Sequence, residues 1–284
     1  MKTKTRILGI LLSIGLFISC TPKDNADTDN TPLAADDVTT ESKIDTAIED
    51  ITLIVEDQNA SQQSAASKSN IAVVRFLPDC AEVTDASTTE NWIKIINFGD
   101  TPCTLRNGNT IKGKITVSFL KTKQEILVLS YKFENFYHNG NLITGDHNIE
   151  LTNKSTATLV TSHPVMTHNI QTTVTLENGK KYIRTGTIIR ELIEGYDNYT
   201  WSDNVVSITG NTSTTLPTGA KVNKTIIIPF LIKSSCTKPY PVKGSFTIEK
   251  NNIDGTVDFG DGECDNNATF KFKGITFPIV LSGK

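Results

Sequence analysis

The sequence predicts an all-β fold, either an antiparallel sandwich or a set of stacked antiparallel sheets, preceded by one short N-terminal helix. Three observations predict this class. From residue 71 onward, apolar and polar residues alternate in short runs separated by turn residues, which is the pattern of half-buried strands. The chain also repeats a cysteine-bearing hairpin unit, and apolar residues recur at helical spacing only in residues 42–57. Sheets with such alternation bury their apolar faces against each other.

Charge is distributed unevenly along the chain, although the net charge of the 284 residues is only −3. Residues 21–70 contain 11 acidic and 3 basic residues, a net charge of −8, whereas residues 71–284 contain 20 acidic and 22 basic residues, a net charge of +2. An acidic leader before a nearly neutral body is typical of a solvated segment joined to a folded domain. Neither part has the basic surface of a nucleic-acid-binding protein, so no nucleic-acid partner is expected.

Residues 1–19 have the organisation of a lipoprotein signal peptide. Basic residues precede an apolar run over residues 7–18, which is shorter than the roughly 20 residues of a membrane span. The end of the run, Ser19-Cys20, resembles a bacterial lipobox, which implies that Cys20 is acylated, with palmitate among its acyl chains, and becomes the mature N-terminus. Thr21 and the acidic residues after Lys23 resemble the sorting signals of outer-membrane and surface lipoproteins. The alternative is an ordinary signal peptide with an incidental cysteine.

The rest of the chain divides by composition into four segments. Residues 20–41 are predicted to be an acidic disordered tether, residues 42–57 an amphipathic helix, and residues 58–70 a flexible linker. The helix rests on the spacing of Ile44, Ile48, Ile51 and Val55, with Thr40 or Ser42 as its N-cap. Residues 71–284 form the β-rich ectodomain, with a division into residues 71–151 and 152–284 left open.

Turn residues and β-branched runs place the strands of the ectodomain. Asn139-Gly140 and Asn178-Gly179 are hairpin signals, because the central residues of such turns need positive φ. Leu127, Leu129, Tyr131 and Phe133 alternate and are expected on one buried face. Pro229 interrupts a β-branched run and predicts an edge strand or a bulge.

The repeated unit consists of a strand, a Phe-Gly-Asp turn and a cysteine. It occurs as Phe98-Gly99-Asp100 before Cys103 and as Phe259-Gly260-Asp261 before Cys264, each copy preceded by a further cysteine, Cys80 or Cys236, and followed at the same offset by a Lys-Gly pair, Lys112-Gly113 or Lys273-Gly274. The glycine of each pair is expected at a bulge or a close backbone approach.

The chain has five cysteines, an odd count for an exported protein, and Cys20 accounts for the odd one. The other four allow three connectivities. The repeat favours Cys80–Cys103 and Cys236–Cys264, because each copy then closes its own loop, and an envelope location permits disulfides. Reduced, buried cysteines are the alternative.

Three carboxylates, Asp258, Asp261 and Asp265, lie in the Gly-rich turn of the second copy and are weak candidates for calcium binding. Aspartate is also a common turn residue that bonds its own backbone, and this reading is preferred. No metal and no cofactor are therefore expected.

Aromatic residues gather in one segment, and histidines do not. Tyr196, Tyr199 and Trp201 lie close to acidic residues and suit sugar stacking or partner binding if exposed; burial in a core is the alternative. The histidines are expected to be scattered over the surface: His138, His147, His163 and His168.

The combined pattern resembles a family of secreted lipoproteins of Bacteroidota, flavobacterial in type. The resembling segments are residues 96–103 with 107–115, residues 133–137 and residues 257–265. The resemblance implies a lipid-anchored outer-envelope protein, with the cell surface as one location, and brings no activity with it. We expect a binding or structural role rather than an enzymatic one, with the membrane as partner through the anchor and a glycan or an envelope protein as ligand. The alternative is a glycan-directed enzyme or an accessory glycan-binding lipoprotein of a polysaccharide system.

Overall fold

A computed structural model of the chain describes residues 31–67, 77–121, 125–198, 200–236 and 240–281. These residues form one long helix, α1 (Ala35–Ser67), a short 3-10 helix, η1 (Trp201–Asp203), and a sheet of 15 strands. The predicted class, an antiparallel β-protein with a helix near its N-terminus, is confirmed. The strands are β1 (Glu82–Asp85), β2 (Asn91–Asn97), β3 (Cys103–Thr104), β4 (Thr110–Leu120), β5 (Leu127–His138), β6 (Asn141–Thr144), β7 (Asp146–Lys154), β8 (His163–Thr175), β9 (Lys181–Glu194), β10 (Val205–Thr215), β11 (Lys221–Lys233), β12 (Lys243–Lys250), β13 (Ile253–Asp261), β14 (Asn267–Phe272) and β15 (Ile275–Val280).

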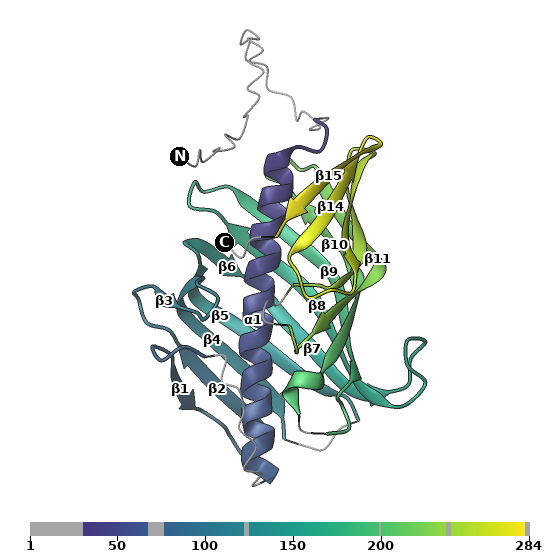
Figure 1. Cartoon of the computed structure of the whole chain (residues 1–284). Coiled ribbons are helices and arrows are strands. Elements are labelled where there is room, and N and C mark those ends of the chain that lie inside the picture. The colour runs from purple at the N-terminus through teal and green to yellow at the C-terminus, as the bar shows by residue number, and fades with distance from the viewer. Residues whose placement is uncertain (1–30, 68–76, 122–124, 199, 237–239, 282–284) are drawn as a thin grey trace, which may run out of the picture.

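The strands form one continuous antiparallel ladder in the order β1-β2-β4-β5-β6-β8-β9-β10-β11-β12-β13-β14-β15. Outside this path, β3 pairs with β4, and β7 pairs with both β5 and β8. The pairing of Leu151 with Met166 carries the ladder across residues 151 and 152, where the sequence left a division open. The sheet curves so that its strands surround one side of α1, which lies along the concave face (Figure 1).

The main core lies between α1 and this concave face. The predicted buried stripe of the helix is confirmed, because Ile44, Ile48, Ile51 and Val55 are all buried in a cluster with strand residues. The predicted face of β5 is confirmed as well: Leu129 and Tyr131 are buried, and Leu127 and Phe133 pack against the same cluster. A smaller cluster lies around Phe230, Phe259 and their neighbours on β10 to β14.

The helix is longer at both ends than the predicted residues 42–57. It begins at Ala35, where the backbone N–H of Ala34 donates to Asp37 Oδ2 at 3.0 Å, so neither Thr40 nor Ser42 is its N-cap. Residues 35–41, predicted as tether, and residues 58–67, predicted as linker, are helical. The reason is tertiary packing: polar residues in both added parts, including Glu41 and Gln58, are buried, and packing supplies most of the stability of a protein helix. Residues 1–30, with the predicted signal peptide and Cys20, and residues 68–70 lie outside the described residues.

The predicted turns are in place. Asn139 and Gly140, both at positive φ, join β5 to β6, and Asn178 and Gly179 lie in the loop between β8 and β9. Strand β11 pairs on both sides, so Pro229 is not on an edge; it lies in a bulge, where the register with β12 shifts between Ile228 and Leu231.

Candidate functional site: the helix–sheet interface

Acidic residues form a second stripe along α1, beside its apolar stripe. Asp37, Glu41, Asp45 and Glu49 follow one another at intervals of four residues, which places them on one side of a helix. Each forms an ion pair with a basic side chain on the concave face of the sheet. The acidic leader is therefore, over residues 37–49, a surface that complements the sheet rather than a solvated segment.

Arg184 of β9 is the centre of this stripe and has no exposed side-chain surface. Its Nη1 lies 2.8 Å from Glu41 Oε2 and donates to Thr212 Oγ1 at 2.6 Å. Its Nη2 donates to Asp45 Oδ1 at 2.7 Å. Burial raises the pKa of Glu41, although Arg184 opposes this. Burial also disfavours ionised Asp45, but Lys224 and Arg184 outweigh it and hold the pKa of Asp45 below its usual value.

Three further cations extend the stripe toward both ends of the helix. Lys224 of β11 lies 2.6 Å from Asp45 Oδ2, and Lys250 of β12 lies 3.1 Å from Asp37 Oδ2. Arg190 of β9 pairs with Glu49. The basic residues come from three different strands, so the docked helix depends on the assembled sheet. Buried ion pairs contribute little net stability but strongly disfavour a shifted register.

The next turn of α1 carries a polar cluster around Asp50. Asp50 Oδ1 accepts from Asn107 Nδ2, and Asp50 Oδ2 accepts from Asn109 Nδ2, both at 2.7 Å. His138 Nε2 lies 2.7 Å from the same Oδ2, and Asn139 Nδ2 donates to Asn109 Oδ1 at 2.9 Å. Asn107 and Asn109 hold the helix against the loop between β3 and β4 through these contacts.

A cluster of buried rings lies below Thr52 of α1. Tyr131 Oη lies 2.8 Å from His168 Nε2, and His168 Nδ1 lies 3.4 Å from Thr52 Oγ1. His147 stacks on Tyr131 with ring centres 4.8 Å apart. Burial lowers the pKa of His147 to about 4 and that of His168 to about 3, with the neighbouring His147 and Arg190 adding to the latter. Burial raises the pKa of Tyr131, so all three rings are neutral near pH 7.

Glu56 lies one turn further along α1, near Arg190 and Glu49. Burial raises its pKa to about 7, Arg190 acts in the opposite direction, and Glu49 adds to the increase. The carboxyl group of Glu56 therefore changes its charge near neutral pH.

His163, at the start of β8, and Glu191, near the end of β9, form a separate buried cluster. His163 Nε2 lies 3.1 Å from Glu191 Oε2, and His163 Nδ1 lies 2.7 Å from the carbonyl oxygen of Thr161. Both ring nitrogens therefore lie within hydrogen-bonding distance of an oxygen atom. Thr156 and Thr158 donate to the same carboxylate at 2.5 and 3.2 Å. The cluster fastens the loop between β7 and β8.

All four histidines are buried, with at most 3% of their surface exposed. The prediction of scattered surface histidines is therefore wrong. Their positions on β5, β7 and β8 point inward with the alternation of those strands, and each ring lies within hydrogen-bonding distance of a polar partner.

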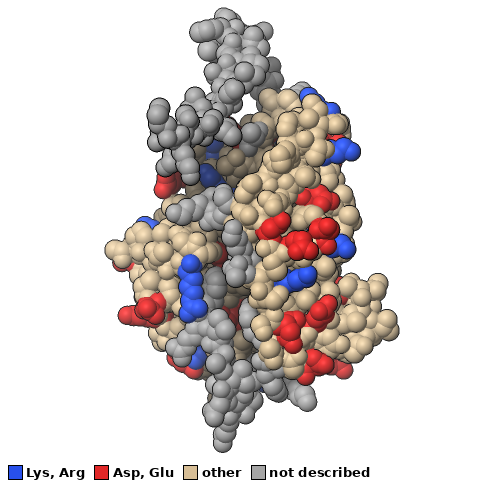
Figure 2. Space-filling model, in the orientation of Figure 1, with Lys and Arg blue, Asp and Glu red and all other residues tan. Residues whose placement is uncertain are grey.

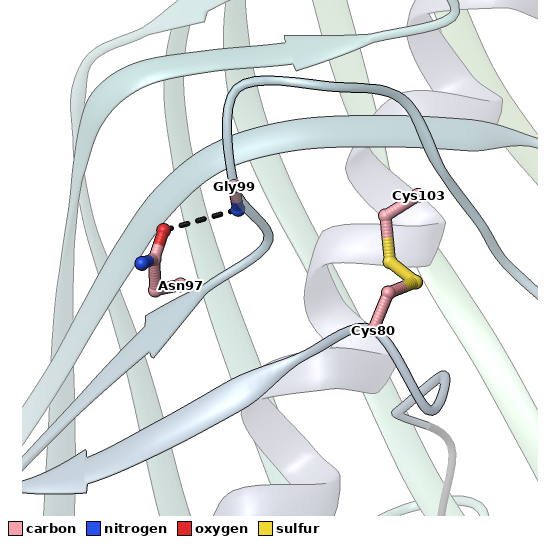
Figure 3. The surroundings of a disulfide bond; sticks show 4 residues. All are labelled: Cys80, Asn97, Gly99 and Cys103. Atoms are coloured by element: carbon pink, nitrogen blue, oxygen red, sulfur yellow. Dashed lines mark hydrogen bonds between the residues drawn. A yellow bond between two sulfur atoms is a disulfide. The ribbon is translucent and has the colours of Figure 1, made fainter.

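The repeated cysteine units form two disulfides, Cys80–Cys103 and Cys236–Cys264, as the repeat favoured. Their turns are built alike. Asn97 Oδ1 accepts from the backbone N–H of Gly99 at 3.1 Å (Figure 3), and Asp258 Oδ1 accepts from that of Gly260 at 2.8 Å. Asp258 therefore has the same turn role as Asn97 in the first copy.

The other two calcium candidates do not join Asp258 in a site. Asp265 accepts hydrogen bonds from the backbone and side-chain nitrogens of Asn267, and Asp261 is in register with Lys243 at the end of β13. Among the described residues, no three acidic, histidine or cysteine side chains are placed to hold a metal ion. These aspartates act as turn residues.

The Lys-Gly pairs differ between the copies. Gly113 lies at a bulge of β4, where the register with β5 shifts, as expected. Lys273 and Gly274, both at positive φ, instead form the two-residue turn between β14 and β15. The repeat thus extends through the turn and the cysteine but not to the following strand.

Of the three aromatic candidates, only Tyr196 can be placed. Its ring is half-buried, with its centre 6.1 Å from that of His163. Tyr199 lies outside the described residues, as does the side chain of Trp201, whose backbone is in η1. The prediction of an aromatic binding surface therefore stays a prediction for Tyr199 and Trp201.

The fold and this interface define a disulfide-bonded antiparallel β-protein whose sheet binds its own acidic N-terminal helix. No protein family model, no curated protein and no solved structure matches the chain. The net charge of the leader does not reveal the interface, because a sum carries no information about the spacing of the acidic residues. Their spacing of four residues was the signal that could have found them.

Proposed function

We propose that this protein is a lipid-anchored protein of the outer envelope with a binding or structural role rather than an enzymatic one. The observation that carries the proposal is the pair of disulfides, Cys80–Cys103 and Cys236–Cys264. Disulfides persist in oxidising compartments outside the cytosol. They leave Cys20, at the end of the apolar leader, as the fifth cysteine of the chain, and lipidation is the role we assign to it.

The arrangement of polar groups supports a non-enzymatic role. The buried clusters around Arg184, Asp50 and His168 are each completed by a side chain of α1. They join the helix to the sheet, so their chemistry is used in assembly. In the described part of the chain, no helix is long and apolar enough to cross a membrane, and the lipid on Cys20 is our proposed attachment.

Mass analysis of the membrane fraction tests the anchor. The chain and its Cys20→Ala variant are expressed in a bacterium that processes lipoproteins. We expect an acylated N-terminal peptide that begins at Cys20, and no acylated peptide in the variant. A mature N-terminus at any other residue, without lipid, would contradict the anchor.

Crosslinking in intact cells, followed by pull-down and by protease shaving, tests the role and the location. Recovery of one envelope protein or one glycan in stoichiometric amount supports the binding role. Turnover of a glycan by the purified protein would support the glycan-directed alternative instead. Digestion of the protein in intact cells would place it at the cell surface, and protection would place it in the periplasm.

A further inference from the structure

The end of the molecule that lies nearest to the proposed anchor can be located from where the described chain begins. Thr31 is held at the turn between β12 and β13: Asn251 Nδ2 donates to its carbonyl oxygen at 2.8 Å, and Lys250 Nζ lies 3.1 Å from its Oγ1. Thr31 follows Cys20 by eleven residues, and a chain of that length spans at most about 38 Å. An anchor on Cys20 therefore keeps this turn within that distance of the bilayer.

The turn between β14 and β15 lies at the same end. Gly255 pairs with Phe272, so the tip of the β14–β15 hairpin lies beside the start of β13. A shallow depression joins the two turns, with Asn252 and Ile253 on one side and Lys271, Lys273 and Gly274 on the other. Asp254 and Thr256 also line this depression.

The tip of this hairpin, Lys271, Lys273, Ile275 and Phe277, exposes apolar and basic side chains: Ile275 and Phe277 lie on one face, Lys271, in register with Thr276, lies on the other, and Lys273 lies in the turn between the strands. Ile275 is 59% exposed and Phe277 is 45% exposed. They pair with Phe272 and Phe270 on the same face, and these two rings are stacked and only partly buried. Lys271 and Lys273 are exposed, and Lys273 Nζ lies 5.4 Å from the ring centre of Phe272.

Charge is distributed unevenly along this part of the surface, and one exposed carboxylate, Asp254, lines the depression with Lys271 and Lys273. Basic side chains are seen at the upper end of the face shown in Figure 2, where the yellow hairpin lies in Figure 1, and acidic side chains gather lower down. Asp265 belongs to the opposite end of the hairpin, because Asn267 pairs with Val280 there. A surface that is basic and apolar at the anchored end complements anionic headgroups above an apolar layer.

A second copy of the chain fits this tip less well. Strand β15 pairs with β14 alone among the described strands, but Pro278 lacks the backbone N–H that an added strand would need. Two copies joined through the tip would also place Lys271 and Lys273 of one copy next to the same lysines of the other, and these like charges repel each other.

We propose that the tip of the β14–β15 hairpin, through Lys271, Lys273, Ile275 and Phe277, contacts the surface of the bilayer that holds the anchor. The inference rests on the proposed lipidation of Cys20. Its occupant is a phospholipid surface with anionic headgroups. The contact fixes the orientation of the concave face and its docked helix relative to the membrane.

Quenching of tryptophan fluorescence by brominated lipids tests the contact. The full chain is produced with Phe277→Trp, lipidated in cells, and reconstituted in vesicles of phosphatidylethanolamine and phosphatidylglycerol with or without brominated acyl chains. The matched control is Val160→Trp, since Val160 is 84% exposed in the loop between β7 and β8. This loop lies at the end of β8 opposite to the β8–β9 turn, and the β8–β9 and β14–β15 turns are at the same end of the sheet. The unsubstituted chain gives the background from Trp92 and Trp201.

We expect brominated lipids to remove most of the added emission of Phe277→Trp and little of that of Val160→Trp. Lys271→Gln with Lys273→Asn, placed in the Phe277→Trp chain, should weaken the contact by about fivefold for each lysine at low salt; asparagine is chosen because it tolerates the positive φ of position 273.

Two results would overturn the inference without touching the anchor. Equal quenching of the Phe277→Trp and Val160→Trp variants, with Cys20 shown by mass to be acylated in both, would mean that the tip does not face the bilayer. A concentration-dependent blue shift of Phe277→Trp in the absence of vesicles would assign the tip to a second copy. Absence of lipid on Cys20 would remove the proposed anchor, and the membrane contact with it.

Discussion

Arg184 Nη2 donates a hydrogen bond to Asp45 Oδ1 at 2.7 Å, across 139 residues of sequence. This contact joins α1 to β9 inside the molecule, in a position where Arg184 has no exposed side-chain surface. Glu41 shares the same guanidinium. Removal of the arginine would therefore leave two carboxylates at the interface without their common partner.

The first prediction concerns Arg184→Met. We expect the free energy of unfolding to fall by about 3–5 kcal/mol, because the loss of one partner leaves an uncompensated buried charge. Urea unfolding at pH 7 measures the change. The matched control is Lys94→Met: Lys94 lies 2.6 Å from Asp85, and this pair is on the surface, where the loss is about 1 kcal/mol or less.

The double variant Glu41→Gln with Arg184→Met separates charge from packing. It should recover part of the loss, since the amide removes the charge that Arg184 balances. Equal losses in the single and double variants would mean that the contribution of Arg184 is packing alone.

The second prediction concerns acid. His147 and His168 have pKa values of about 4 and about 3, below the ordinary value of 6.5. The unfolded chain therefore binds protons first as the pH falls below 6.5, and stability decreases until the pH reaches the folded pKa values. Each pKa unit corresponds to about 1.4 kcal/mol, so acidification from pH 6.5 to 4 should cost about 3 kcal/mol for each of these histidines. Chemical unfolding between pH 7 and pH 4 measures this slope.

Two substitutions identify the groups behind this slope. His168→Gln should flatten the decrease between pH 6.5 and 4. Glu56 acts in the opposite direction: its folded pKa of about 7 lies above the ordinary 4.5, so its contribution is full below pH 4.5 and is lost as the pH rises to 7. Glu56→Gln should therefore steepen the net acid loss. An unchanged slope in both variants would assign the acid sensitivity to other groups.

The third prediction concerns the disulfides. Replacement of Cys80 and Cys103 by Ala should lower the free energy of unfolding by about 3 kcal/mol, since the bond closes a loop with a sequence separation of 23. The second bond, with a separation of 28, should contribute a similar amount. Urea unfolding of the two double variants gives both values, and a non-reducing peptide map of the parent protein shows the pairing. A peptide that joins Cys80 to Cys236 would refute the pairing.

Local features of the sequence predicted the strands, the turns and the repeated units, because each depends on neighbours in the chain. Asn97 and Asp258 illustrate this: each bonds the backbone two residues ahead, so a short motif is sufficient to specify the turn. The alternation around Leu129 and Tyr131 similarly predicts a buried face without any information about its packing partners.

The interface was not predictable in the same way, because its partners are distant in sequence. Asp37 pairs with Lys250 from 213 residues away, and Asp50 meets His138 from 88 residues away. The length of α1 also depends on the sheet, since Glu41, which lies in the part of the helix that was not predicted, is buried and pairs with Arg184 of β9. A prediction from local propensity alone therefore gives a helix that begins too late, at residue 42, and ends too early, at residue 57.

The last prediction concerns Gly113, at the bulge of β4. A Cβ on this residue would lie 2.0 Å from the backbone oxygen of Asn135, and its φ of +92° is unfavourable for other residues. We expect Gly113→Ala to lower the free energy of unfolding by more than about 3 kcal/mol, since both backbone strain and a clash with main chain must be relieved. The matched control is Gly99→Ala, because Gly99 has a similar φ of +77° and nothing within 4 Å of its Cβ position. This control should lose only about 1–2 kcal/mol, the cost of the left-handed conformation. Equal losses in the two variants, measured by urea unfolding, would show that the strand around Asn135 moves aside and that the bulge does not depend on its close approach to β5.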